Sequence, residues 1–369
     1  MIMIEKRANC HRFFLDAGER TEPDRSPTMC MRKGLMSERV RRGFRGMRSE
    51  NGLQGGGLLR AMVASAIWFA TSPAVSAGFS VDRTDAQLTL KEEGRPVFSF
   101  NHGEIQPPNG GVARSGYIHP LYGLDGDVLT DDFPSDHPHH RGVFFGWPRM
   151  TVMGEDVDVW HLRGLQPRFH EWEEIRVEDD TASLRVVNLW RPEGSERPAV
   201  EERVRYLVRP ADEAGRVIDI RGTFSNLTRE PVVLRGQTGA GYGGLNVRMD
   251  GGRPEVVITT ANGALDGDAD VEEPASPWAA HTSRAGDHGP RSGVAIFQHP
   301  GNPGYPVPSW TLRHYGFLGA AWPGQRSHTI EPGETLELRY RLLVFRGSAD
   351  EAEVAERFAE FLDGRTEQR

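Results

Sequence analysis

The sequence predicts an all-β fold, a large antiparallel β-sandwich with one C-terminal helix. Residues 335–342 alternate strictly between apolar and polar or charged side chains, which is typical of a strand with one buried face. Glycine and proline recur roughly every ten residues, the spacing of turns in sandwiches and barrels. No G-x-G-x-x-G motif follows an expected strand and opens a helix, and there is no G-x-S-x-G motif, so nucleotide-binding and α/β-hydrolase folds are not expected.

Short strands are expected through most of the chain after residue 78. In one of them Ile218, Ile220 and Phe224 share a face, while polar side chains occupy the other. The pair Asp179 and Asp180 falls where a hairpin turn should lie. The expected strands cover residues 175–177, 184–189, 201–208, 218–224, 232–234, 256–260 and 335–342.

A single helix is expected near the C-terminus. Ser348 can cap it, and Glu351 three residues later completes a capping box. Apolar side chains then follow at positions i, i+4, i+7 and i+8, which lie on one helical face: Val354, Phe358, Phe361 and Leu362. This face should pack on the sheet.

Residues 1–77 have the features of a leader that ends in a secretory signal peptide. An apolar run over residues 58–70 follows Arg48, and small residues at 74–77 predict cleavage after Ala77. The arginine-rich residues before about 47 are expected to be disordered, and translation is expected to begin at Met36 or Met47. Residues 78–369 would then form a single β-sandwich domain that is periplasmic or secreted.

Charge and cysteine content exclude several classes of function. Residues 1–77 have a net charge of +6, so the remainder has −14 against −8 for the whole chain, which does not suit nucleic-acid binding. Both cysteines, Cys10 and Cys30, lie in the leader. The mature domain therefore has no disulfide, thiolate metal site or cysteine nucleophile. No later segment is apolar enough to cross a membrane.

The segment most informative about function is the histidine loop, residues 130–142. It contains three aspartates, three histidines and one arginine, a density of titratable groups that is typical of functional sites. Because Pro138 favours an extended backbone before it, His137 and His139 are expected to point to the same side. His140 and Arg141 are expected to diverge from them.

Two resemblances add to these observations. Residues 117–122 (YIHPLY), 129–134 (LTDDFP) and 136–142 (DHPHHRG) resemble the methane-oxygenase-like family of exported bacterial proteins. Residues 223–228 (TFSNLT) and 331–335 (EPGET) resemble the second half of galactose-mutarotase-like supersandwich domains. The first resemblance implies a metal-dependent oxidoreductase, and the second implies the supersandwich fold and a carbohydrate ligand.

Three hypotheses apply to the histidine loop. In acid–base catalysis, His137 or His139 would transfer a proton, because imidazole titrates nearest neutral pH. Asp132 or Asp136 would orient the ring, and Arg141 would bind an anionic group.

The second hypothesis is a site for a single divalent metal held by His137, His139 and Asp132, a ligand set that suits several transition metals. Asp131 could replace Asp132 in that set, and His119 could supply a third imidazole. The third hypothesis is a rigid loop with no chemistry, stiffened by its prolines and capped by its aspartates.

Further substrate contacts are expected from aromatic, imidazole and amide side chains, since aromatic rings stack on sugars and the glycine-rich segment around Tyr242 permits close approach. Core positions are an equally acceptable interpretation of the aromatic ones. The candidates are His119, Tyr122, His140, Trp147, Trp160, Gln237, Tyr242 and His299.

The sequence thus favours an exported carbohydrate-active enzyme, a lyase, epimerase or hydrolase that uses His/Asp acid–base chemistry. A non-catalytic glycan-binding protein of the cell envelope and a mononuclear metal oxidoreductase are the alternatives. The expected partner is a small molecule or oligosaccharide, with no nucleic acid and no membrane span after removal of the signal peptide.

Overall fold

The computed structural model describes residues 78–108, 110–271, 276–306 and 309–364. The predicted leader, its cleavage site after Ala77 and the two candidate start residues lie outside them. Within the described residues there is no helix long and apolar enough to cross a membrane.

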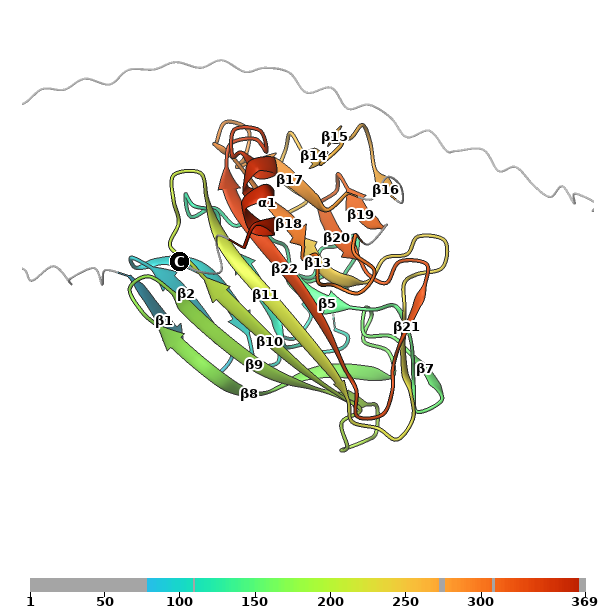
Figure 1. The fold of residues 1–369 in the computed structure, drawn as a ribbon. Coiled ribbons are helices and arrows are strands. Elements are labelled where there is room, and N and C mark those ends of the chain that lie inside the picture. Colours follow the sequence, from blue (N-terminus) through green and yellow to red (C-terminus); the bar gives the residue numbers. More distant parts are fainter. Residues whose placement is uncertain (1–77, 109, 272–275, 307–308, 365–369) are drawn as a thin grey trace, which may run out of the picture. The chain divides into compact units, whose positions relative to one another are not determined.

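The described strands form three sheets in which the paired strands are antiparallel (Figure 1). The first sheet has the order β1 (Phe79–Arg83), β2 (Gln87–Glu92), β3 (Arg95–Asn101), β4 (Tyr117–Leu121), β5 (Val143–Gly146), β13 (Gly244–Arg248), β20 (Phe317–Ala321), β19 (Trp310–Arg313) and β16 (Ala269–Val271). The second has the order β15 (Gly263–Ala264), β14 (Val257–Thr260), β17 (Trp278–Arg284), β18 (Arg291–Gln298), β22 (Thr335–Arg346), β11 (Gly215–Asn226), β10 (Val200–Val208), β9 (Ala182–Pro192) and β8 (Leu165–Val177). The small third sheet has the order β21 (Ser327–Ile330), β12 (Val232–Arg235), β6 (Arg149–Val152) and β7 (Glu155–Val157).

The main hydrophobic core lies between the two large sheets. Tyr206 of β10 packs against Phe98 and Phe100 of β3, with ring centroids 5.9 Å apart in both cases. Ile220 and Phe224 of β11 are buried in the same core. Burying a large apolar side chain of this kind stabilises the fold by about 1.5–3 kcal/mol. The structure is therefore all-β with one C-terminal helix, as predicted.

The strands expected from alternation are confirmed, and most are longer than expected. β8 begins at Leu165, ten residues before the expected start, and β22 continues to Arg346. The hairpin turn at Asp179 and Asp180 is also confirmed, because the backbone N–H of Glu178 donates to the carbonyl of Thr181 over 2.8 Å.

None of the expected strand ranges falls in the first sheet, and β15, β17 and β18 of the second sheet were not expected either. All five residues are buried in each of β13 and β20, because loops cover the face of the sheet that points away from the main core. A strand that is buried on both faces has no polar alternation to recognise.

The C-terminal helix α1 (Val354–Leu362) starts later than predicted. The capping box forms, since Ser348 and Glu351 exchange backbone–side-chain hydrogen bonds of 2.7 and 3.2 Å. It closes a separate turn, however, because Glu353 has a left-handed φ of 51° and the helix begins only after it. Phe358 and Phe361 pack on the outer face of the second sheet, whereas Leu362 is exposed.

Glu202 of β10 is an unusual member of the main core. Its carboxylate accepts hydrogen bonds from Trp190 Nε1 over 2.8 Å and from Asn188 Nδ2 over 3.2 Å. Burial raises the pKa of Glu202 to about 7, and the two hydrogen bonds oppose the shift without cancelling it.

This burial predicts a pH-dependent stability. The folded pKa of Glu202 exceeds the unfolded value, so its contribution is fully present below about pH 4 and is lost as the pH rises towards 7. We expect the free energy of unfolding of wild type, relative to Glu202→Gln, to fall by about 3 kcal/mol between pH 4 and pH 8. Urea denaturation at several pH values measures this difference. Parallel pH profiles for the two chains would contradict the assignment.

Candidate active site

The histidine loop connects β4 to β5 and covers the outer face of the first sheet. Phe144 of β5 and Phe317 of β20 point away from the main core and form a separate apolar cluster with Tyr117 and Trp160. His140 packs on this cluster, with its ring centroid 4.6 Å from that of Phe317 and 5.7 Å from that of Trp160. The loop therefore has an aromatic floor.

The backbone of the loop turns where it was expected to be extended. The N–H of His140 donates to the carbonyl of His137 over 2.8 Å, which closes a turn with Pro138 at its second position. The rings of His137 and His140 consequently stack, 4.6 Å apart with 2° between their planes. The ring of His139 lies 4.5 Å from that of His140. The prediction that His140 diverges is therefore wrong, and the three imidazoles form one cluster.

A buried ion pair between Arg114 and Asp132 anchors the loop. Their side chains are 3% and 9% exposed, and the hydroxyl of Tyr117 donates to the same carboxylate over 2.7 Å. Arg114 also donates to the carbonyls of Pro138 over 3.0 Å and His140 over 2.9 Å. Asp132 thus holds the loop in place, and it has no hydrogen bond to a loop imidazole among the described residues.

Arg141 is part of the same support. Its guanidinium donates to the carbonyls of Val159 over 3.1 Å and Trp160 over 3.3 Å, and it lies 4.3 Å from the ring centroid of Phe144. Burial lowers the pKa of Arg141 to about 9. The predicted role in binding an anionic group is not supported, because this side chain is buried beneath the loop.

Asp136 contacts a histidine of the loop. Its carboxylate lies 2.9 Å from Nδ1 of His137 and accepts a hydrogen bond of 3.0 Å from Arg248, at the end of β13. Burial alone would raise the pKa of Asp136, but the hydrogen bond with His137 and the charge of Arg248 outweigh it and leave the pKa below its ordinary value. The ring of Tyr315 stacks on the ring of His137, with ring centroids 4.9 Å apart.

A second imidazole–carboxylate pair joins the cluster from the segment after β7. Nδ1 of His161 lies 2.5 Å from the carboxylate of Asp158, which also accepts backbone hydrogen bonds of 2.8 Å from Trp160 and His161. The ring of His161 is 4.3 Å from that of His139. No local pattern predicts the contact between His161 and His139, because the two residues are 22 positions apart in the chain.

Burial makes the central imidazoles hard to protonate. It lowers the pKa of His139 to about 3, assisted by the neighbouring His161 and His137, and it lowers the pKa of His140 further. His139 is therefore neutral near pH 7 and can accept a hydrogen bond.

Other predicted contact residues lie outside the cluster. Trp147 is fully buried in the main core and donates from Nε1 to the carbonyl of Trp322 over 2.9 Å, so it is a core residue. His119 faces Thr130, with 3.1 Å between Nδ1 and the hydroxyl oxygen, and burial lowers its pKa. Tyr122 forms an isolated bridge with Val128.

The remaining candidates divide between this site and another. Trp160 is 2% exposed and therefore belongs to the floor, while the ring of Tyr242, 4.7 Å away, is half-buried and can be reached from outside. Gln237 is joined to Tyr242 by a backbone hydrogen bond of 3.1 Å. His299 lines a cavity on the outer face of the second sheet and is not part of the histidine cluster.

The cluster does not match the predicted metal set. Among the described residues there is no group of three or more His, Cys, Asp or Glu side chains placed to hold a metal ion. Asp132 has its two carboxylate oxygens committed to Arg114 and Tyr117, so the set of His137, His139 and Asp132 is not assembled.

The anchoring role of Asp132 is testable. Asp132→Asn leaves the buried charge of Arg114 without its counterion and should destabilise the fold by about 3 kcal/mol. Asp125→Asn is the control, because Asp125 and its partner Arg346 are both 41% exposed, and its loss should destabilise the fold by less than about 1 kcal/mol. Chemical denaturation measures both, and equal losses would show that the buried pair does not anchor the loop.

Three solved structures with distant similarity to this chain are a galactosidase, a lyase and a mutarotase-like protein. An alpha-galactosidase from Lactobacillus brevis is 10% identical with a TM-score of 0.40, and the match covers 75% of this chain and 41% of that one. A heparan sulfate lyase from Pedobacter heparinus is 10% identical with a TM-score of 0.34, and the match covers 74% and 36%. A galactose mutarotase-like protein from Lactobacillus casei is 8% identical with a TM-score of 0.33, and the match covers 73% and 100%.

The chain therefore corresponds to less than half of the length of the first two proteins. Comparison with curated proteins gives no significant match. Residues 87–359 match the protein-family model described as "Family of unknown function (DUF6807)". The matched region covers about three quarters of the sequence. The chain belongs to the DUF6807 family.

Proposed function

We propose that this chain is an exported carbohydrate-directed enzyme that transfers protons through the histidine cluster. The proposal rests on one observation: two imidazole–carboxylate pairs, His137–Asp136 and His161–Asp158, flank the neutral ring of His139 above an aromatic floor. A loop that served only as a rigid connection would not need carboxylates paired with His137 and with the neighbouring His161.

His161 is the strongest candidate for the group that meets the substrate. Its Nδ1 is engaged by Asp158, so the neutral ring has its free lone pair on Nε2. Its side chain is 24% exposed, whereas His140 is buried. An oriented imidazole with one accessible nitrogen is the arrangement that a general base requires.

His139 complements His161. The two rings are 4.3 Å apart, and the pKa of His139 is lowered by burial to about 3, so its ring is neutral and does not oppose a charge on its neighbour. Two titratable groups whose environments differ within one site are suited to separate acid and base roles. The chemistry that follows is proton transfer at a sugar carbon or at a glycosidic oxygen, the step shared by epimerases, lyases and hydrolases.

The sugar class of the substrate is supported by the tyrosines beside the cluster. Tyr315 stacks on His137, and the half-buried Tyr242 contacts Trp160. Exposed parts of aromatic rings of this kind offer an apolar face with a polar edge, which suits the C–H faces of a sugar ring. The same tyrosines favour the second candidate function, a glycan-binding protein without catalysis.

Substitution of the histidines distinguishes the two functions. A panel of glycans and oxidised sugars, followed by mass change and by solvent deuterium incorporation, identifies the substrate. We expect His161→Ala or His139→Ala to lower its turnover by about 10²–10⁴-fold with binding nearly unchanged. His170→Ala, an exposed histidine on β8, is the control and should keep full turnover. If sugars bind but none is converted, the binding function is correct.

Export is tested separately. We expect the protein to be recovered from the periplasm or the medium with Gly78 as its first residue, because the sequence before it predicts a signal peptide. N-terminal sequencing of the purified protein gives the answer. A cytoplasmic product that retains residues 48–77 would contradict export and leave the chemistry of the cluster untouched.

A further inference from the structure

Four arginines form a row across the outer face of the second sheet. Arg205 of β10 lies directly opposite Arg185 of β9 and Arg221 of β11, and Arg221 lies opposite Arg339 of β22. None of the four is buried, whereas their chain neighbours Tyr206, Ile220 and Tyr340 lie in the main core. Like charges directly opposite one another destabilise a sheet, so the needs of the fold do not explain this row.

Carboxylates compensate the row only in part. Glu337 accepts a hydrogen bond of 2.7 Å from Nε of Arg221 and is also paired with Arg339, so one carboxylate serves two guanidinium groups. Asp219 is shared in the same way between Arg209, over 2.8 Å, and Arg341, over 2.9 Å.

Arg205, in the middle of the row, has no carboxylate within ion-pair distance among the described residues. Its Nε donates to the hydroxyl of Ser183 over 3.1 Å, and that hydroxyl in turn donates to Glu174. Arg185 lies 3.4 Å from Glu173, which also pairs with Arg203. The row therefore has more positive than negative charge around its centre.

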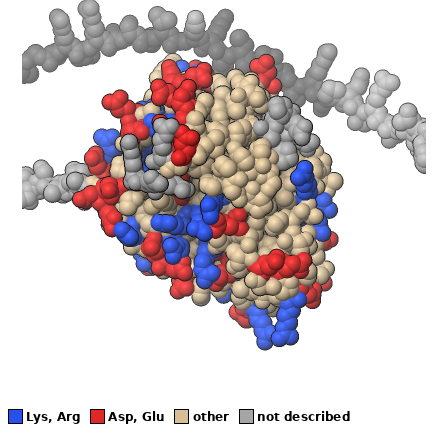
Figure 2. Space-filling view, in the orientation of Figure 1, with Lys and Arg blue, Asp and Glu red and all other residues tan. Residues whose placement is uncertain are grey.

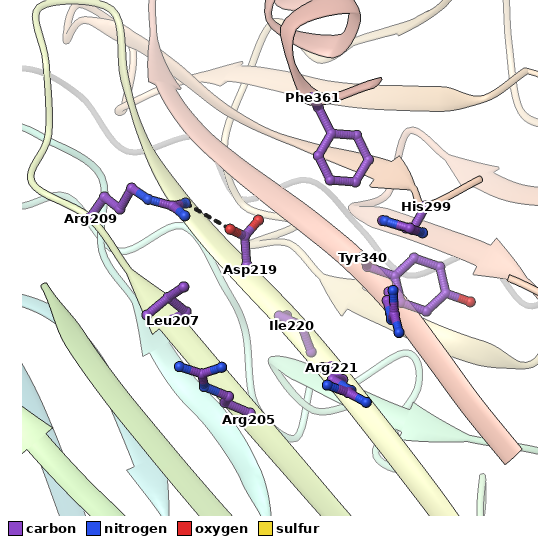
Figure 3. A pocket seen from close by; sticks show the side chains of 10 residues that line it. Arg205, Leu207, Arg209, Asp219, Ile220, Arg221, His299, Tyr340 and Phe361 are labelled. Atoms are coloured by element: carbon purple, nitrogen blue, oxygen red, sulfur yellow. Dashed lines mark hydrogen bonds and ion pairs between the residues drawn. The ribbon is translucent and has the colours of Figure 1, made fainter. Parts of the chain in front are cut away.

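A cavity of about 350 Å³ opens over the centre of this row (Figure 3). Arg205, Arg209 and Arg221 lie on one side of it, and His299 and Phe361 form the other. Asp219 is the single carboxylate among its lining residues. Figure 2 shows basic side chains gathered over the middle strands of this sheet, with acidic ones between them. The cavity thus combines excess positive charge with an aromatic wall.

We propose that this arginine row binds a linear acidic oligosaccharide. Neighbouring strands are about 4.8 Å apart, so four arginines offer guanidinium groups along roughly 14 Å, a length that suits a chain with repeated anionic groups. Guanidinium groups bind carboxylates and sulfates through paired hydrogen bonds. The site lies on the second sheet, whereas the histidine cluster covers the first. The anionic character of the ligand follows from the row alone, and its sugar character rests on the proposed function.

Equilibrium binding to the full chain tests the proposal. Labelled oligogalacturonide and heparin-derived oligosaccharide are compared with a neutral oligosaccharide of the same length, which separates carboxylate from sulfate ligands. Wild type should bind at least one of the acidic chains and not the neutral one. The double substitution Arg205→Gln and Arg221→Gln should weaken binding by about a hundredfold or more, because it removes two charged hydrogen-bond donors from the ligand site.

Arg176→Gln is the matched control, because Arg176 is an exposed arginine of the same sheet that pairs with Glu178 outside the row. It should leave the affinity within about twofold of wild type. Turnover is not part of this measurement, so a failure of the proposed catalysis would not be mistaken for a failure of this site. The double variant should melt at or above the wild-type temperature, because the substitutions remove repulsion between arginines on neighbouring strands. If the double variant does not fold, the single variant Arg205→Gln is used in its place.

Three results would overturn the proposal. One is that neither acidic oligosaccharide binds, and another is that the double variant binds them as well as wild type does. The third is that an oligonucleotide of equal charge binds as tightly, which would show a general attraction for polyanions and not a glycan site.

Discussion

The buried ion pair between Arg114 and Asp132 is the interaction on which the candidate site depends. A guanidinium that is 3% exposed needs a counterion and hydrogen-bond acceptors, and one carboxylate and two loop carbonyls provide them for both terminal nitrogens of Arg114. Those carbonyls belong to Pro138 and His140, the second and fourth residues of the turn that stacks the imidazoles. The ion pair therefore fixes the backbone, and the backbone fixes the relative positions of the rings. Asp132, which the sequence suggested as a catalytic partner, therefore acts by holding the histidine loop in place.

The two large sheets divide the molecule into one shared core and two separate outer faces. In the first sheet the outer face is covered by the histidine loop and the segment that contains Asp158 and His161, so its central strands are buried on both sides. In the second sheet the outer face stays open around β10 and β11 and exposes the arginine row. Proton transfer and anion binding can therefore be placed on different surfaces without disturbing the core between them.

Polar groups also penetrate that core. Glu202 is held there by Trp190 and Asn188, and the charge of Arg141 beneath the histidine loop acts on it. A buried carboxylate of this kind is more stable protonated than charged, which explains why its pKa is raised. The support of the loop and the interior of the sandwich are thus electrostatically connected, although the imidazoles themselves lie on the outer side of the first sheet.

The sequence by itself determined the all-β class, six strands of the second sheet (β8, β9, β10, β11, β14 and β22), the hairpin at Asp179 and Asp180 and the dense titratable groups of the histidine loop. Each of these features depends on residues that are close in the sequence. The signals are the alternation of apolar and polar side chains, the residue types at turns and a local density of titratable groups. Only the tertiary structure decided the rest. Arg114 meets Asp132 from 18 residues away, His161 joins His139 from another segment, and the arginines align only because four strands pair in one register. Such contacts depend on long-range packing and cross-strand pairing, which no local pattern contains. The strands that are buried on both faces were not predicted, because their sequences lack the alternation of apolar and polar side chains.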